Sequence, residues 1–179
     1  DPRDGFRDAL MHWVEGGVYP KPYPVIEEDK LKLTGDLMPV MTTLPRVSPA
    51  GLMRYRSSGF GREYEGNLFS AQFNTGRVMR HVITPIGATF RTEDFPFMTS
   101  DSLDTHPTDV LEDADGSLLV VNTGGWFIAG CPLSVVAKTD IHGGIFRIRK
   151  VDAPGMEDPW GRRLDFKSMS PDNVSGFLN

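Results

Sequence analysis

The residue best suited to chemistry in this chain of 179 residues is His106, which stands in a loop just before a short apolar segment. Histidine changes charge near neutral pH, so His106 could act as a general base that removes a proton from a hydroxyl group. Asp109 follows closely and could orient that imidazole or bind a cation. Each residue also has a plainer explanation, because a loop histidine can bond to backbone and an aspartate at a strand start can cap a turn.

Other residues with chemical potential have simpler explanations. The single cysteine, Cys131, excludes a disulfide within the chain and any site built from several cysteines. Asp113 and Asp115 are spaced as in a calcium loop, but the further acidic ligands of an EF-hand are missing, so we expect a tight turn. We therefore predict no metal site from the residues of this chain. His12 and His81 lie in apolar segments and are expected to be structural.

The segments around these residues are typical of short strands separated by turns. The 19 glycines and 14 prolines exceed average usage and favour a turn-rich chain. We expect strands at residues 52–56, 67–73, 77–86 and 89–99, and again at 109–112, 117–122 and 143–150. The predicted fold class is all-β.

The second group of strands repeats the order of the first. The sequence GNLF at 66–69 matches GSLL at 116–119, and GRVMR at 76–80 is similar to GIFR at 144–147. A period of about 40–50 residues with four short strands per unit is the signature of β-propeller blades. Two units cannot close a ring and would leave unpaired edges. We therefore expect a β-propeller fragment of about two blades.

The rest of the chain differs in composition from this repeat. Residues 1–35 are expected to be an irregular lead-in from a preceding blade, in which residues 6–15 could form a short helix. Residues 36–150 hold the blades, and residues 151–179 hold a linker and a short helical start after Ser170. The chain begins without Met and stops within that young helix, so we expect it to be an excised piece of a longer protein.

Charge and hydropathy argue against two classes of protein. The chain has 19 Lys and Arg against 24 Asp and Glu, which gives a net charge of −5. This charge argues against a nucleic-acid-binding surface, because such surfaces neutralise phosphates with basic side chains. No apolar stretch approaches the roughly 18 residues that a transmembrane helix needs.

The region between residues 105 and 148 resembles a known family. The runs THPTDVLEDADGSLLVV at 105–121, GGWF at 124–127 and GGIFRI at 143–148 carry the resemblance. They resemble the planctomycete-type "membrane-bound dehydrogenase" β-propellers, which are similar to the soluble glucose/sorbosone dehydrogenase superfamily. DPWG at 158–161 is similar to the point where that family passes into helical, HEAT-like repeats.

The resemblance implies a six-bladed propeller in an exported or periplasmic protein, associated with the membrane through segments outside this sequence. It implies a dehydrogenase-like quinoprotein that oxidises a sugar or polyol-type alcohol, with pyrroloquinoline quinone and calcium as cofactors. In that reaction His106 would remove the hydroxyl proton while hydride leaves for the quinone. Electrons could then reach a c-type haem in a cytochrome domain elsewhere, since this sequence has no Cys-x-x-Cys-His motif. The alternative is a non-catalytic propeller scaffold that binds carbohydrate or protein, because a propeller fold does not decide function.

Four loop segments should open on the same face if the repeat is a pair of blades. Sites commonly lie on loops that a rigid scaffold positions. Besides His106, these loops present the candidate substrate-binding residues Arg46, Asn74, Trp126 and His142. Trp126 could offer an aromatic platform to a sugar or quinone ring, or the loop could simply pack its own aromatic residues on the sheets.

The second unit has only three convincing strands. We expect its outer strand to come from the remaining propeller blades of the same chain, so that residues 143–150 form an exposed edge. Arg147, Arg149 and Lys150 are expected to protect that edge in part, because charged side chains discourage pairing with other strands. Without the whole ring to hold substrate and cofactor in place, the fragment alone should be inactive.

Overall fold

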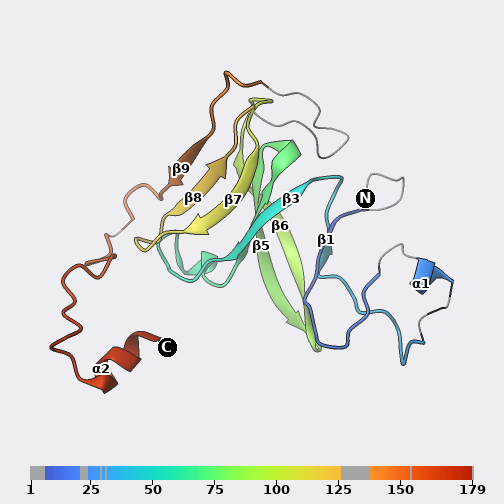
Figure 1. Ribbon diagram of the computed structural model, residues 1–179, viewed down its shortest axis with the longest axis horizontal. Helices are drawn as coiled ribbons and strands as arrows, with labels where there is room; N and C mark the ends of the chain where they lie inside the picture. Colours follow the sequence, from blue (N-terminus) through green and yellow to red (C-terminus); the bar gives the residue numbers. More distant parts are fainter. Residues whose placement is uncertain are drawn as a thin grey trace.

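Two larger antiparallel sheets form the centre of the molecule, as a computed structural model shows (Figure 1). The structure describes residues 7–20, 24–28, 30, 32–125, 138–153 and 155–178. The first sheet contains, in spatial order, β3 (Pro49–Arg54), β4 (Leu68–Gln72), β5 (Arg77–Ile86) and β6 (Thr89–Thr99). The second contains, in spatial order, β7 (Pro107–Glu112), β8 (Leu118–Asn122) and β9 (Gly144–Ile148). The predicted all-β class is confirmed.

Short elements flank these sheets. β1 (Ala9–Leu10) pairs with β2 (Thr42–Thr43) in a small antiparallel sheet. The remaining elements are α1 (Pro24–Glu27), η1 (Arg62–Tyr64), η2 (Phe73–Thr75), α2 (Pro171–Ser175) and η3 (Gly176–Leu178). The Ser170 side chain accepts a hydrogen bond from the Asn173 amide at the start of α2, which is the predicted helix start.

The expected helix at residues 6–15 is wrong. Its apolar residues do not form one face of a helix, because the backbone at β1 is extended and bonds to β2 instead. Leu10 is buried there against Leu44 and Val47 in a small core of its own. Tertiary pairing has therefore overruled a weak helical pattern.

The main core lies between the two larger sheets. Phe69 and Val78 of the first sheet pack with Val110 and Leu118 of the second, and all four are fully buried. The Tyr55 hydroxyl, which follows β3, donates a hydrogen bond of 2.6 Å to the carbonyl oxygen of Gly116 in the β7–β8 turn. Burial raises the pKa of Tyr55, because desolvation disfavours the phenolate. Apolar packing and this bond hold the sheets together.

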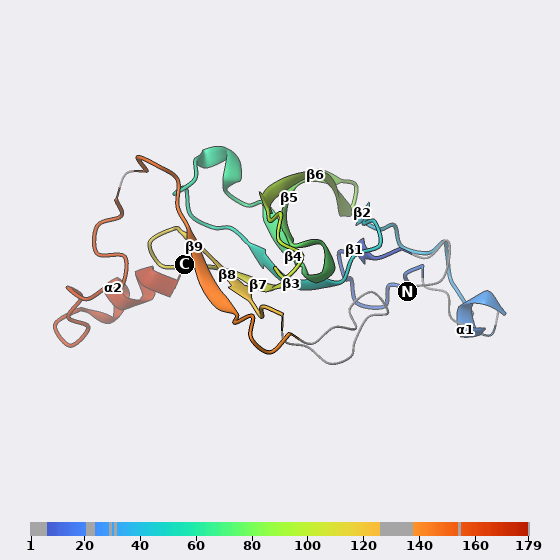
Figure 2. The same ribbon diagram turned by 90° about the horizontal axis from the view of Figure 1, so that it is seen from above.

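The elements follow one another along the long axis of the molecule (Figures 1 and 2). In both views α2 lies beyond the β7–β9 sheet, whereas β1 and α1 lie on the far side of the β3–β6 sheet. The antiparallel order gives the two sheets two ends. The loop end comprises the chain before β3, the β4–β5 turn, the β6–β7 connection and the described residues between β8 and β9, which are 123–125 and 138–143. The opposite end comprises the β3–β4 connection, the β5–β6 turn and the β7–β8 turn.

Candidate functional site

His106 is half-buried at the loop end, where contacts from several segments fix its ring. Its Nδ1 lies 2.7 Å from the carbonyl oxygen of Gly124. The ring stacks at a tilt on Phe73, with 4.7 Å between the ring centroids. Because a carbonyl oxygen can only accept, Nδ1 carries the proton in the neutral imidazole and the lone pair is on Nε2. This tautomer gives His106 a basic nitrogen suited to accept a proton.

Hydrogen bonds and ring contacts bring the loop segments together at this end. Asn74 Oδ1 accepts a bond of 2.9 Å from the Ser48 amide, which joins the β4–β5 turn to the chain before β3. The contact of Phe73 with His106 joins the same turn to the β6–β7 connection. An ion pair of 2.6 Å between Lys138 Nζ and Asp104 Oδ1 adds the chain that leads into β9. Asn74 and His106 thus lie at the same end of the sheets.

The other candidate residues have different settings. Arg46 is exposed in the segment between β2 and β3, and His142 is exposed just before β9. Trp126 and Cys131 lie outside the described residues. The structure therefore places Arg46, Asn74, His106 and His142 on segments of the loop end.

Asp109 lies along β7 rather than in a loop. Its Oδ1 accepts a hydrogen bond of 2.8 Å from the Val110 amide, where the pairing of β7 with β8 shifts register. The same oxygen approaches the backbone of β3 at Gly51. This setting favours a structural role for Asp109, in which its carboxylate accepts a hydrogen bond from the backbone amide of Val110 in an irregular strand.

Asn122 is a positioning residue that the sequence analysis did not single out. Its Oδ1 accepts hydrogen bonds from the amides of His106, at 2.7 Å, and Gly124, at 3.2 Å. The Asn122 side chain therefore binds the backbone of both His106 and Gly124, and the carbonyl oxygen of Gly124 in turn orients the His106 ring. An asparagine at a strand end two residues before a glycine is a turn signal, and that signal could have identified it.

The residues of the loop end do not fit a calcium ion or a quinone cofactor. Calcium takes about six to eight oxygen ligands, whereas the two carboxylates nearest to His106 in the sequence, Asp104 and Asp109, are turned toward Lys138 and toward backbone. Within the described ranges, no group of three or more His, Cys, Asp or Glu side chains could hold a metal ion. Lys138, a cation that could face the carboxylates of a quinone, is itself paired with Asp104. We therefore assign no cofactor contacts to these residues.

A Ser–His–Asp constellation crosses the first sheet. His81 Nε2 lies 2.8 Å from Ser70 Oγ, and His81 Nδ1 lies 2.7 Å from Asp94 Oδ1. Asp94 Oδ2 accepts a further bond of 2.7 Å from Thr42 Oγ1. Only 1% of Ser70 and 0% of His81 is exposed, so a substrate carbonyl cannot reach the hydroxyl. The constellation is a structural network that joins β4, β5, β6 and β2, and His81 has the structural role expected of it.

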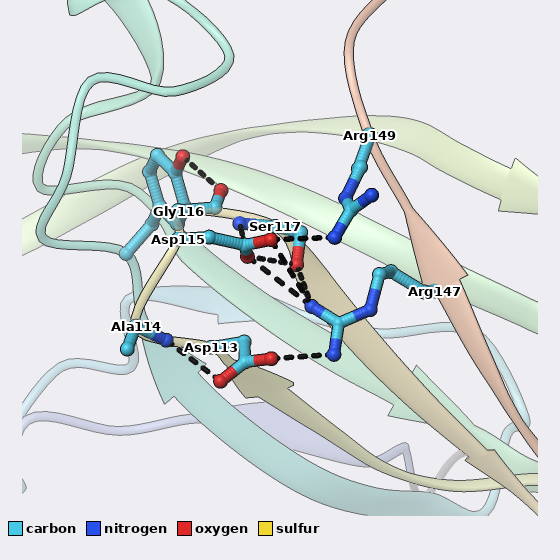
Figure 3. A network of polar contacts seen from close by, with 8 residues as sticks. Asp113, Ala114, Asp115, Gly116, Ser117, Arg147 and Arg149 are labelled. Carbon is cyan, nitrogen blue, oxygen red and sulfur yellow. Dashed lines mark hydrogen bonds and ion pairs between the residues drawn. The ribbon is translucent and has the colours of Figure 1, made fainter. Parts of the chain in front are cut away.

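The β7–β8 turn holds a second polar network, drawn in Figure 3. Arg147 on β9 forms ion pairs with Asp113, at 2.5 Å, and with Asp115, at 3.2 Å. Arg149 lies 2.7 Å from Asp115. The Gly116 amide donates to the Asp113 carbonyl oxygen, which gives the tight turn predicted for this segment.

These contacts show which groups the two arginines bind. Their guanidinium groups are directed to the carboxylates of the turn, and the expected protection of the β9 edge by these charges stays a prediction. Hydrogen bonds from the Ser117 side chain and amide, together with Arg149, lower the pKa of Asp115 to about 2. The two aspartates therefore serve as acceptors for basic side chains.

Comparisons with protein-family models, with curated proteins and with solved structures found no match to this chain. Membership of the dehydrogenase-like propeller family thus stays a prediction from the sequence motifs. The function is argued below from that resemblance together with the geometry of His106.

Proposed function

We propose that the two larger sheets are consecutive blades of a six-bladed β-propeller, and that the β7–β9 sheet is the closing blade. Three observations support this proposal: the strands of both sheets follow the same order, the first strands β3 and β7 lie against each other, and the connecting loops converge at one end. The remaining blades, and the strand that completes the β7–β9 sheet, belong to other parts of the same protein.

We further propose that this protein is a dehydrogenase-like enzyme that acts on a sugar or polyol-type alcohol bound at the loop end. The observation that carries the proposal is the bond between His106 Nδ1 and the Gly124 carbonyl oxygen. That bond leaves the lone pair on Nε2, which accepts the proton of a substrate hydroxyl group. The Gly124 carbonyl oxygen then stabilises the imidazolium that forms, because it faces the Nδ1–H dipole.

Substrate recognition falls to the side chains around this histidine. Asn74 Oδ1 accepts a hydrogen bond from the Ser48 amide, so we assign to the Asn74 NH2 group the role of donor to a hydroxyl oxygen of the substrate. We assign the remaining substrate contacts to Arg46, Trp126 and His142, and we assign to Asp109 the support of the strand that carries His106. Hydroxyl-rich ligands suit such a set of donors and acceptors.

The oxidation also needs a two-electron acceptor. The resemblance implies a quinone with calcium, and a c-type haem in a separate cytochrome domain, but the described residues do not make up their sites. We therefore assign substrate binding and removal of the hydroxyl proton to this chain, and cofactor binding to other blades. The proposal also includes export to the periplasm or beyond. Among the described residues, no helix has the length and apolar character needed to cross a membrane.

The test is dye reduction with a panel of sugars and polyols, supplied with pyrroloquinoline quinone and calcium. It uses the longer protein to which the proposal assigns this chain, with the 179-residue chain beside it. We expect His106→Gln to lower kcat by about 100-fold or more, because general base catalysis contributes that much. Arg91→Gln, an exposed change on β6, is the control. Unchanged turnover in His106→Gln would remove the histidine from the reaction. Sugar binding with no turnover by the unmodified protein would establish the alternative, a carbohydrate-binding scaffold.

A further inference from the structure

A second site is suggested by a cleft at the opposite end of the sheets from His106. The cleft has a volume of about 410 Å³ and opens between the end of β3 and the β7–β8 turn. This volume lies within the range of about 300–1,000 Å³ that is usual for ligand sites. Asp113 and Ala114, which line it, lie in the turn drawn in Figure 3. The cleft shares no residue with the loop end.

Apolar side chains provide one part of the lining. Met53 enters the cleft from β3 and also packs against the main core, so its position is fixed. Leu111 enters from β7 and keeps 45% of its surface exposed. Ala114 adds a small side chain from the turn. An apolar ligand body that covers this surface would remove it from water, which is favourable.

The carboxylates of the lining are already engaged within the protein. The two oxygens of Glu112 accept hydrogen bonds from the amides of Arg56, at 2.7 Å, and Ser57, at 2.8 Å. Asp113 accepts a bond of 2.8 Å from the Ala114 amide and forms an ion pair with Arg147. Neither carboxylate therefore needs a cation from a ligand.

The arginines of the lining have capacity left for a ligand. Arg54 uses Nε to donate a bond of 3.2 Å to the Gly66 carbonyl oxygen, and no ion pair engages its terminal nitrogens within the described residues. Arg56 is exposed, and in the described part of the chain its guanidinium forms neither an ion pair nor a hydrogen bond. A guanidinium presents donors in a fork that matches a carboxylate.

We propose that this cleft binds a small organic acid with one carboxylate and an apolar body, such as a short-chain fatty acid. The carboxylate is bound by Arg56 and Arg54, and the body lies on Met53 and Leu111. A single negative charge is favoured over a dianion such as phosphate, because the charges of Glu112 and Asp113 remain close by. The proposal does not depend on the sugar or polyol substrate proposed for the loop end.

The first experiment titrates hexanoate into the ¹⁵N-labelled 179-residue chain and follows the backbone amide signals. We expect saturable shifts at Arg56, Ser57 and Ala114, and none at Asn74 or His106. Hexanol, which has the body without the charge, and acetate, which has the charge without the body, should each bind at least tenfold more weakly. Inorganic phosphate should cause no shift of the amide signals of Arg56, Ser57 and Ala114. Equal binding of hexanoate and acetate, or shifts confined to the loop end, would overturn the proposal.

The second experiment compares variants. Arg56→Gln removes the charge but keeps a side chain of similar reach, and should weaken hexanoate binding about tenfold, the loss expected for one charge-assisted hydrogen bond. Arg91→Gln makes the same change on β6 and should leave binding unchanged. Leu111→Ser should weaken hexanoate binding while leaving acetate binding as it was. Hexanoate affinity that is the same in Arg56→Gln and Arg91→Gln would exclude the site, whatever the sugar assays show for His106.

Discussion

Gly51 of β3 and Asp109 of β7 lie so close together that residue 51 has no room for a side chain. A Cβ atom on residue 51 would lie 1.9 Å from Asp109 Oδ1 and 2.6 Å from Asp109 Cα. These distances are far below van der Waals contact, and one of them involves backbone that cannot rotate away. The glycine therefore sets how closely the first strands of the two sheets can approach each other.

Gly51→Ala should lower the free energy of unfolding by about 1–3 kcal/mol, because the added methyl group forces β3 and β7 apart. Urea denaturation followed by tryptophan fluorescence measures this change. Gly35→Ala is the matched control, since a Cβ there would meet no atom within 4 Å. Equal stability of the two variants would show that β3 and β7 do not touch in solution.

The strands were predictable from the sequence because alternation and glycine turns both mark them. The expected segments 77–86 and 89–99 coincide with β5 and β6, and the remaining expected strands differ from the observed ones by a few residues at their ends. The failure at residues 6–15 has a physical cause. A two-residue strand such as β1 is too short to show an alternation of apolar and polar residues. It forms because it pairs with Thr42 and Thr43, which lie more than 30 residues further along the chain.

The site was predictable only at the level of its loops. The strand repeat alone placed Asn74 and His106 at one end of the sheets, where the structure has them. The hydrogen-bond and ion-pair partners of these side chains could not be predicted from the sequence. Gly124 as the acceptor for His106, and Asp113 as the partner of Arg147, depend on which loops meet after folding. Local sequence carries little information about such contacts.

Asn122→Ala should loosen the setting of His106 without unfolding the sheets. The change removes the acceptor for the His106 and Gly124 amides. Each lost hydrogen bond costs about 1 kcal/mol, so exchange of these two amides with solvent deuterium should accelerate about fivefold or more. Asn173→Ala in the exposed helix α2 is the control. Exchange at His106 that is as slow as in the unmodified chain would contradict the role assigned to Asn122.

Acid should remove a part of the stability that depends on Asp115. Its pKa in the folded chain is lowered from 3.8 to about 2, first by the hydrogen bond from the Ser117 side chain and also by Arg149. The unfolded chain therefore binds a proton at a higher pH than the folded chain does. The stabilisation is complete above about pH 4 and is lost as the pH falls toward about 2.

Urea denaturation between pH 2 and pH 7 tests this linkage. Asp115→Asn should be less stable than the unmodified chain at neutral pH, and the difference should narrow as the pH falls below about 4. Asp140→Asn, in an exposed turn before β9, should give a difference that is small at every pH. A stability gap for Asp115→Asn that stays constant down to pH 2 would mean that the Asp115 carboxylate has its ordinary pKa.

The basic side chains on and after β9 are bound to other parts of the protein. Arg147 and Arg149 are directed to Asp113 and Asp115, and Lys150 donates a bond of 3.1 Å to the Phe60 carbonyl oxygen. In the described part of the chain, β9 pairs with β8 alone. Its backbone thus presents unpaired donors and acceptors on the other side.

Exposed apolar side chains on β9 also favour association with another chain, because Ile145 is 69% exposed and Phe146 is 54% exposed. An exposed apolar edge strand pairs readily with another strand, so the 179-residue chain should self-associate as its concentration rises. Sedimentation velocity should show this as an increasing sedimentation coefficient. Ile145→Lys places a charge on the strand itself and should shift association to concentrations about tenfold higher. Val151→Lys, beyond β9 and 83% exposed, adds the same charge away from the edge and should associate as the unmodified chain does. Equal association of the two lysine variants would show that chains meet through another surface.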